Sequence, residues 1–288
     1  MKKNYVILLF SVIALIMLFP VIFALSNSFM SGAEIADRYA KTITPTNWFD
    51  FTLPPIHFAR LGLIPDYLTA RQYLELFFLR PDILRYFWNS VLITLPVVLG
   101  QCLVSAPAAY AFEQMRWKHK EIAFFVYAVI MLMPLQVVMV PNFIVAEWLG
   151  LRKSYLAIIL PGIFTPFGTF LIRQQLRGFP KEYYEAAQMD GASHRCYFLK
   201  VVLPAVKPTI AALAILTFVE YWNMVDQAVV FIRESWREPM SVFLSALMTQ
   251  ETAMLFVASV FYMLPAIFVF LLGQEQMVQG IQLSGLKA

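Results

Sequence analysis

Long apolar runs alternate with polar segments along this chain. Six of the runs approach the length of about 20 residues that a helix needs to cross a bilayer core. They predict membrane-spanning helices at residues 5–25, 88–112, 122–143, 155–172, 208–231 and 254–272. The first run is longer than the core of a secretory signal peptide, so we interpret it as an uncleaved anchor. The pattern predicts an all-α polytopic membrane protein, with residues 1–288 forming one transmembrane domain.

Two polar segments between the runs are long. Residues 26–87 are rich in aromatic residues and contain Pro45, Pro54, Pro55 and Pro65. They predict a large extracytoplasmic loop with one amphipathic helix near residues 70–79. Residues 173–207 separate the fourth run from the fifth, and residues 232–253 form a further polar loop before the sixth.

The basic residues lie mostly at the ends of apolar runs, which controls topology in membrane proteins. One set of ends carries Lys2, Lys3, Arg116, Lys118, Lys120, Arg173, Arg177, Lys181, Arg195, Lys200, Lys207 and Lys287. The short loops on the opposite side carry only Arg152, Lys153, Arg233 and Arg237. Because basic residues favour the cytoplasmic side, we expect both termini and residues 173–207 to be cytoplasmic.

Composition excludes several classes of protein. The chain is 60% hydrophobic and 14% charged, with a mean hydropathy of +0.68, which does not suit a soluble domain. The net charge of +4 is explained by topology, so we expect no nucleic-acid partner. Two cysteines and three scattered histidines predict neither a disulfide framework nor a metal site.

Catalytic motifs are missing from the sequence as well. The runs contain no paired catalytic residues, and no Gly-x-x-x-x-Gly-Lys sequence occurs that could bind ATP phosphates. We therefore expect no enzyme activity and no cofactor in this chain, and we expect any energy source to be a separate subunit.

The region from residue 179 to residue 208 carries the most specific pattern. Pro180 and Glu182 favour a helix start, and Gly191 favours a left-handed turn that ends the helix. Ser193 can cap a second short helix, which we expect to end before Pro204. By itself this describes an ordinary helix-turn-helix on a surface.

The spacing of particular letters in this region is more telling. Glu185-Ala186-Ala187 is followed after three residues by Gly191, after nine more by Val201, and then by Leu203-Pro204. This resembles the EAA signature of permease subunits in ATP-driven importers, with Val201 in place of the usual isoleucine. The rest of the chain is similar to the permeases of binding-protein-dependent carbohydrate importers, most of all to the second permease of the maltose system.

The resemblance implies the type I permease fold of ABC importers and a prokaryotic inner-membrane location. It implies a complex with a second permease subunit, two ATPase subunits that bind ATP and Mg, and an extracytoplasmic solute-binding protein. Residues 173–207 would contain the coupling helix that sits in a cleft of the ATPase. The resemblance implies that the residues of the signature couple the permease to the ATPase; they are Glu185, Ala186, Ala187, Gly191, Val201, Leu203 and Pro204.

A polar patch in the fifth run is the candidate translocation path. Glu220 lies near the middle of that run, where a charged side chain costs roughly 2.5–3.5 kcal/mol and should face protein or water. Asn223 and Gln227 follow on the same helical face, and Trp222 adds an aromatic ring that suits sugars. A polar contact between helices, with no substrate, explains the patch equally well.

These observations predict a permease subunit that imports a sugar or oligosaccharide by alternating access, coupled to the ATPase through the EAA loop. One alternative is an importer permease for another solute, such as glycerol phosphate. Another is a secondary transporter driven by protons, with Glu220 as the proton carrier.

Overall fold

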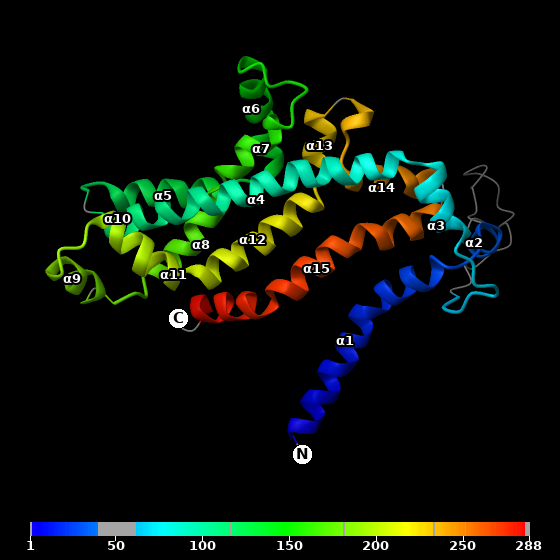
Figure 1. Cartoon of the computed structure of the whole chain (residues 1–288), viewed down its shortest axis with the longest axis horizontal. Coiled ribbons are helices and arrows are strands. Elements are labelled where there is room, and N and C mark those ends of the chain that lie inside the picture. The colour runs from blue at the N-terminus through cyan, green and yellow to red at the C-terminus, as the bar shows by residue number, and fades with distance from the viewer. Residues whose placement is uncertain are drawn as a thin grey trace, which may run out of the picture. The chain divides into compact units, whose positions relative to one another are not determined.

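The computed structural model describes residues 2–39, 62–115, 117–180, 182–232, 234–250 and 252–285. Within these ranges the chain is helical, with no strand (Figure 1). Residues 40–61 of the long polar segment at 26–87, which hold Pro45, Pro54 and Pro55, fall outside the described residues.

Four described helices are long and apolar enough to cross a membrane. They are α1 (Lys2–Asn27), α4 (Asp82–Gln114), the run Leu156–Leu176 formed by α7 (Leu156–Ile163) and α8 (Pro166–Leu176), and α15 (Thr252–Gly285). Two bent pairs raise the number to six if each pair forms one span. These pairs are α5 (Lys120–Met131) with α6 (Leu135–Trp148), and His194–Ala205 with α12 (Lys207–Trp222).

The third and fifth runs, predicted as spans at residues 122–143 and 208–231, are each interrupted in the structure. The axes of α5 and α6 differ by 102° across a break that contains Pro134. Proline lacks an N–H and disfavours helical backbone in the residue before it, so the chain turns there. The fifth run breaks after Trp222 and resumes as α13 (Asp226–Phe231).

The chain divides into two compact units. The first comprises Met1–Phe87 with Met240–Leu264, and the second comprises Trp88–Pro239 with Pro265–Ala288. The first unit holds α1, α2 (Gly32–Tyr39), α3 (Arg71–Leu74), the π-helix Glu75–Leu79 and α14 (Met240–Gln250). Its core packs Leu76, Ile83, Met240, Leu247, Val257 and Ala258.

The amphipathic helix expected near residues 70–79 corresponds to α3 and the π-helix that continues it. The helix α2 was not predicted from the sequence. Ser31 directly precedes that helix, and its Oγ accepts a hydrogen bond from the Glu34 N–H at 3.2 Å. Glu34 and Arg38, which are four residues apart in α2, form an ion pair with a nitrogen–oxygen distance of 2.8 Å.

The second unit packs its helices closely through small residues. A Cβ placed on Gly168 of α8 would lie 2.3 Å from Ser105 Oγ on α4 and 2.8 Å from a Leu213 methyl group on α12. Only glycine allows these three helices to approach so closely, and small residues serve this purpose in membrane bundles. Side-chain hydrogen bonds add to the packing, from Thr217 to Gln101 and from Thr209 to Gln175.

Asn89, near the start of α4, ties that helix to the segment after α13. Its Nδ2 donates to the backbone oxygens of Trp236 and Glu238, at 3.0 and 2.9 Å. Trp236 belongs to the short 3-10 helix Ser235–Arg237. The position of this polar segment is therefore set by the bundle helix beneath it.

Candidate functional site

The helix of the EAA region is α9 (Glu182–Met189), and Gly191 ends it as expected. Gly191 has a φ of 72°, in the left-handed region that favours glycine. Its N–H donates to Gln188 O at 3.0 Å, and the Ala192 N–H donates to Ala187 O at 2.9 Å. This pair of bonds forms a Schellman motif, which satisfies the last carbonyls of the helix.

The second helix of the region begins as predicted but does not end as predicted. Ser193 Oγ accepts a hydrogen bond from the Cys196 N–H at 3.3 Å and caps α10 (His194–Tyr197). The helical path continues through the π-helix Phe198–Val202 and α11 (Leu203–Ala205), so it passes Pro204. Pro204 lies in the first turn of α11, directly after the π-helix.

The EAA residues divide between two faces of α9. Tyr184 and Ala187 are partly buried against the core cluster of the second unit, which includes Tyr110, Tyr197 and Val202. Glu185 and Ala186 are exposed. Residues 184 and 187 share a helical face from which residue 186 is turned away, so of the two alanines only Ala186 is exposed.

The remaining signature residues belong to the same packing. Val201 and Leu203 contact the core cluster, whereas Pro204 is exposed. Val201 thus acts as a partly buried aliphatic residue, and either valine or isoleucine can fill this role.

His194 links the EAA helix to the membrane bundle, and the sequence analysis had treated it as an isolated residue. Its Nδ1 lies 3.0 Å from the Tyr110 hydroxyl on α4, and its Nε2 lies 3.2 Å from the Tyr184 hydroxyl on α9. Gln188 Nε2 donates to the same Tyr184 hydroxyl at 2.9 Å. We call Tyr110, His194 and Tyr184 the histidine bridge. A neutral imidazole donates from one nitrogen and accepts at the other, so the two hydroxyls take opposite roles.

Arg173 forms a second junction beneath this region. It was counted among the basic residues that set topology, yet it is only 1% exposed. Its Nε lies 3.1 Å from a Glu113 oxygen and its Nη2 lies 2.8 Å from a Glu121 oxygen. Its guanidinium also lies 3.8 Å from the centre of the Phe124 ring. Arg173 therefore joins the ends of α4, α5 and α8, which the spacing of these residues in the sequence could not reveal.

The polar residues of the fifth run line a cavity. Its volume is about 590 Å³, and Glu220, Tyr221 and Gln227 contribute to its wall with residues of α5, α6, α7 and α8. An adjoining hollow of about 260 Å³ shares these three residues and adds Asn223 and Asp226. We call the two together the bundle cavity. Its size lies within the range of about 300–1,000 Å³ typical of small-molecule sites.

Trp222 does not belong to this set. It is 1% exposed and stacks on Phe218, with the ring centres 5.3 Å apart. Asn223 has a structural task as well, because its Nδ2 donates to Val219 O at 2.8 Å where α12 ends. Of the four predicted path residues, the structure therefore brings Glu220, Asn223 and Gln227 to the bundle cavity and buries Trp222 in the bundle.

Comparisons with known proteins agree with this architecture. The family model described as binding-protein-dependent transport system inner membrane component matches residues 101–282. The arabinooligosaccharides transport system permease protein of Halalkalibacterium halodurans is 28% identical over 281 residues, covering 96% of this chain and 94% of its own length. The lactose transport system permease protein of Rhizobium radiobacter is 30% identical over 71% of this chain and 76% of its own length.

The fold has a counterpart among solved structures. A chain from a bacterial ABC transporter involved in the import of the acidic polysaccharide alginate superposes with a TM-score of 0.74. The two chains are 23% identical, and the match covers 95% of each. The likeness shows a shared fold.

Proposed function

Because the chain belongs to the inner membrane components of binding-protein-dependent transport systems, we propose that it imports a sugar or oligosaccharide. The observation that carries the proposal is the similarity, over most of the chain, to permeases named for arabinooligosaccharides and lactose. The family consists of multi-pass membrane permeases of ABC importers rather than enzymes, and the ATPase is a separate subunit.

The complete transporter that we propose contains this chain, a different second permease and two ATPase subunits that hold ATP and Mg. A solute-binding protein delivers the sugar from outside. Both termini and residues 173–207 are cytoplasmic in this arrangement, which the distribution of basic residues supports.

In this proposal α9 is the coupling helix. Its outer face presents Glu185, Ala186 and Met189, which is 89% exposed, to the ATPase. A small residue at position 186 allows close approach, and Glu185 supplies a charge for a basic partner residue. Its inner face transmits the movement through the histidine bridge to Tyr110, and so to α4.

The bundle cavity is the part of the translocation path that this subunit supplies. Glu220 and Gln227 offer hydrogen-bonding groups of the kind that sugar hydroxyls bind, and Tyr221 adds an aromatic ring. Alternating access would expose these groups first to the outside and then to the cytoplasm as ATP is bound and hydrolysed.

Two other transport functions compete with this one. An importer for glycerol phosphate would need cations for the phosphate, and the described wall of the bundle cavity holds Glu220 and Asp226 but no lysine or arginine. A secondary transporter driven by protons through Glu220 would leave the surface of α9 without a role.

Reconstitution tests the proposal. Vesicles containing the full complex should accumulate labelled lactose or arabinooligosaccharides only when the solute-binding protein is outside and ATP is present at the ATPase. Accumulation driven by a pH gradient without ATP would support the secondary transporter instead. Uptake of glycerol phosphate but of neither sugar would show that the proposed substrate class is wrong, while the ABC mechanism would still hold.

A further inference from the structure

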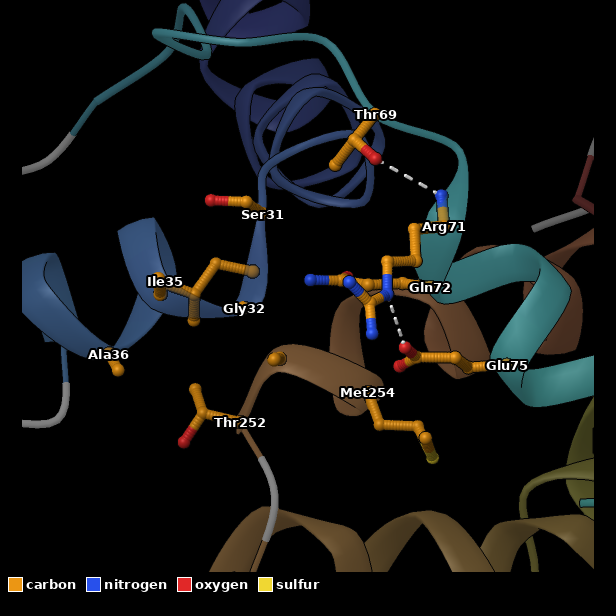
Figure 2. A pocket seen from close by; sticks show the side chains of 12 residues that line it. Ser31, Gly32, Ile35, Ala36, Thr69, Arg71, Gln72, Glu75, Thr252 and Met254 are labelled. Carbon is orange, nitrogen blue, oxygen red and sulfur yellow. Dashed lines mark hydrogen bonds and ion pairs between the residues drawn. The ribbon is translucent and has the colours of Figure 1, made fainter. Parts of the chain in front are cut away.

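A pocket with several polar side chains in its wall lies within the first unit. Its volume is about 590 Å³, and its wall comes from the start of α2, from α3 and its π-helix, and from the start of α15 (Figure 2). The contributing residues belong to the segments 26–87 and 232–253 or adjoin them, and both segments were predicted to be extracytoplasmic. We call this the outer pocket.

Gln72 is the unusual residue of the outer pocket. It is 5% exposed, and neither its Nε2 nor its Oε1 has a hydrogen-bond partner among the described residues. Figure 2 shows its amide extending from α3 toward the space beside Gly32. Buried amide groups are nearly always paired, so this one is open to a partner that the described residues do not supply.

Backbone donors lie on the opposite wall. At the start of α2, Ser31 accepts hydrogen bonds from the N–H groups of Glu34 and Ile35. The N–H groups of Gly32 and Ala33 have no such partner in the described part of the chain. A Cβ on Gly32 would lie 3.7 Å from Gln72 Nε2, so these donors and the amide border the same space.

The start of α2 favours an anionic group, while the two charged lining side chains, Arg71 and Glu75, have opposite charges. The positive end of the α2 dipole points into the outer pocket, and helix N-termini bind carboxylates. Arg71 adds a guanidinium, while the neighbouring Glu75 carboxylate accepts a hydrogen bond from Arg71 Nε at 2.8 Å. That pairing reduces the repulsion that Glu75 would otherwise exert on an entering anion.

We propose that the outer pocket receives an aspartate or glutamate side chain of the solute-binding protein. This rests on the proposed function, because that partner acts on the extracytoplasmic side. The carboxylate accepts from the Gln72 amide and from the N–H groups that begin α2, and Gln72 Oε1 accepts a backbone N–H of the same partner segment. A free sugar fits less well, because the residues that line the pocket include no aromatic ring on which a sugar could stack.

The test measures the affinity of the solute-binding protein of the same system for the assembled transporter in nanodiscs. Gln72→Leu removes the amide at similar volume, and Gln72→Glu places a negative charge against the entering carboxylate. Each should weaken binding roughly tenfold or more while basal ATPase activity is unchanged, since a hydrogen bond to a charged group is lost. Thr94→Val is the matched control, because Thr94 is also fully buried with an unpaired Oγ1 but lies on α4 outside the pocket.

A second variant protects the test against misfolding at position 72. Gly32→Pro removes one N–H donor at a helix position that suits proline, and a Cβ at this position would meet only ordinary contacts. It should weaken binding in the same way. Normal affinity for the solute-binding protein in Gly32→Pro and in the assembled Gln72 variants would overturn the proposal. The proposal would also be overturned if the complex bound lactose without the solute-binding protein and this binding depended on Gln72. Failure of the solute-binding protein to stimulate wild-type ATPase activity would instead overturn the proposed function itself.

Discussion

Gly191→Val is the substitution that most sharply tests whether α9 couples the ATPase to the bundle. Gly191 has a φ of 72°, and a Cβ at this position would meet nothing within 4 Å. The substitution therefore adds no clash with a neighbour, and its cost is the strain of a β-branched residue in the left-handed region. That strain is roughly 1–2 kcal/mol, which corresponds to a shift of about 5–30-fold toward conformations in which the turn has opened.

The opened turn would lose the two hydrogen bonds that end α9 and would change the position of that helix. The apolar runs are untouched, so we expect the variant to insert and to assemble with its partner permease. The measurement is ATPase co-purification together with sugar uptake per ATP hydrolysed in vesicles. Retention of the ATPase, uptake per ATP or both should fall.

Gly150 provides a matched control in the same chain. It has a φ of 67° and also has open space around it, but it lies in the loop between α6 and α7. Gly150→Val imposes the same left-handed backbone strain far from α9 in the sequence. Gly191→Asn introduces a residue that tolerates the left-handed turn. Both controls should transport sugar with near-normal coupling. Normal coupling in Gly191→Val, or an equal loss in Gly150→Val, would refute the assignment of α9 as the coupling helix.

Three further predictions follow from the described residues. Arg173→Met leaves two carboxylates without their shared cation and should lower the stability of the purified complex by about 1.5–3 kcal/mol. The substitution Arg177→Met, at an exposed position, should change the stability little. Equal melting temperatures for the two variants would contradict the buried junction. Glu220→Gln should reduce sugar uptake severalfold with the complex assembled and its basal ATPase activity intact, and unchanged uptake would make the polar patch structural. In a cysteine-free background, Tyr67→Cys should react with an impermeant maleimide from outside and Lys118→Cys should not, and the reverse labelling would invert the predicted orientation.

Turn chemistry was predictable because it depends on neighbouring residues. Gly191 adopts the left-handed turn for which glycine is suited, and Ser193 caps the next helix through its own side chain. The same local reasoning was incomplete at Pro204, because a π-helical segment shifts the register before it and lets the helix continue. Thr46 and Glu251, which belong to the two long loops predicted to be extracytoplasmic, lie outside the described residues.

The direction in which a side chain points was less predictable. Trp222 and Glu220 were assigned to one path, yet Trp222 is buried in the bundle while Glu220 lines the bundle cavity. Ala187 was assigned to a partner protein and packs against its own chain. The partners of Arg173 lie 60 and 52 residues away from it in the sequence.

The sequence by itself determined which stretches are apolar enough to cross a membrane, which family signature the chain carries, and where local turns end its helices. These properties follow from transfer free energy and backbone conformation, which each stretch carries alone. Only the tertiary structure decided which helix faces meet, where the bundle cavity and the outer pocket form, and that His194 joins α9 to α4. Membrane helices are apolar on all sides, because lipid and protein neighbours are equally apolar, and so their sequences do not mark the face that will be packed.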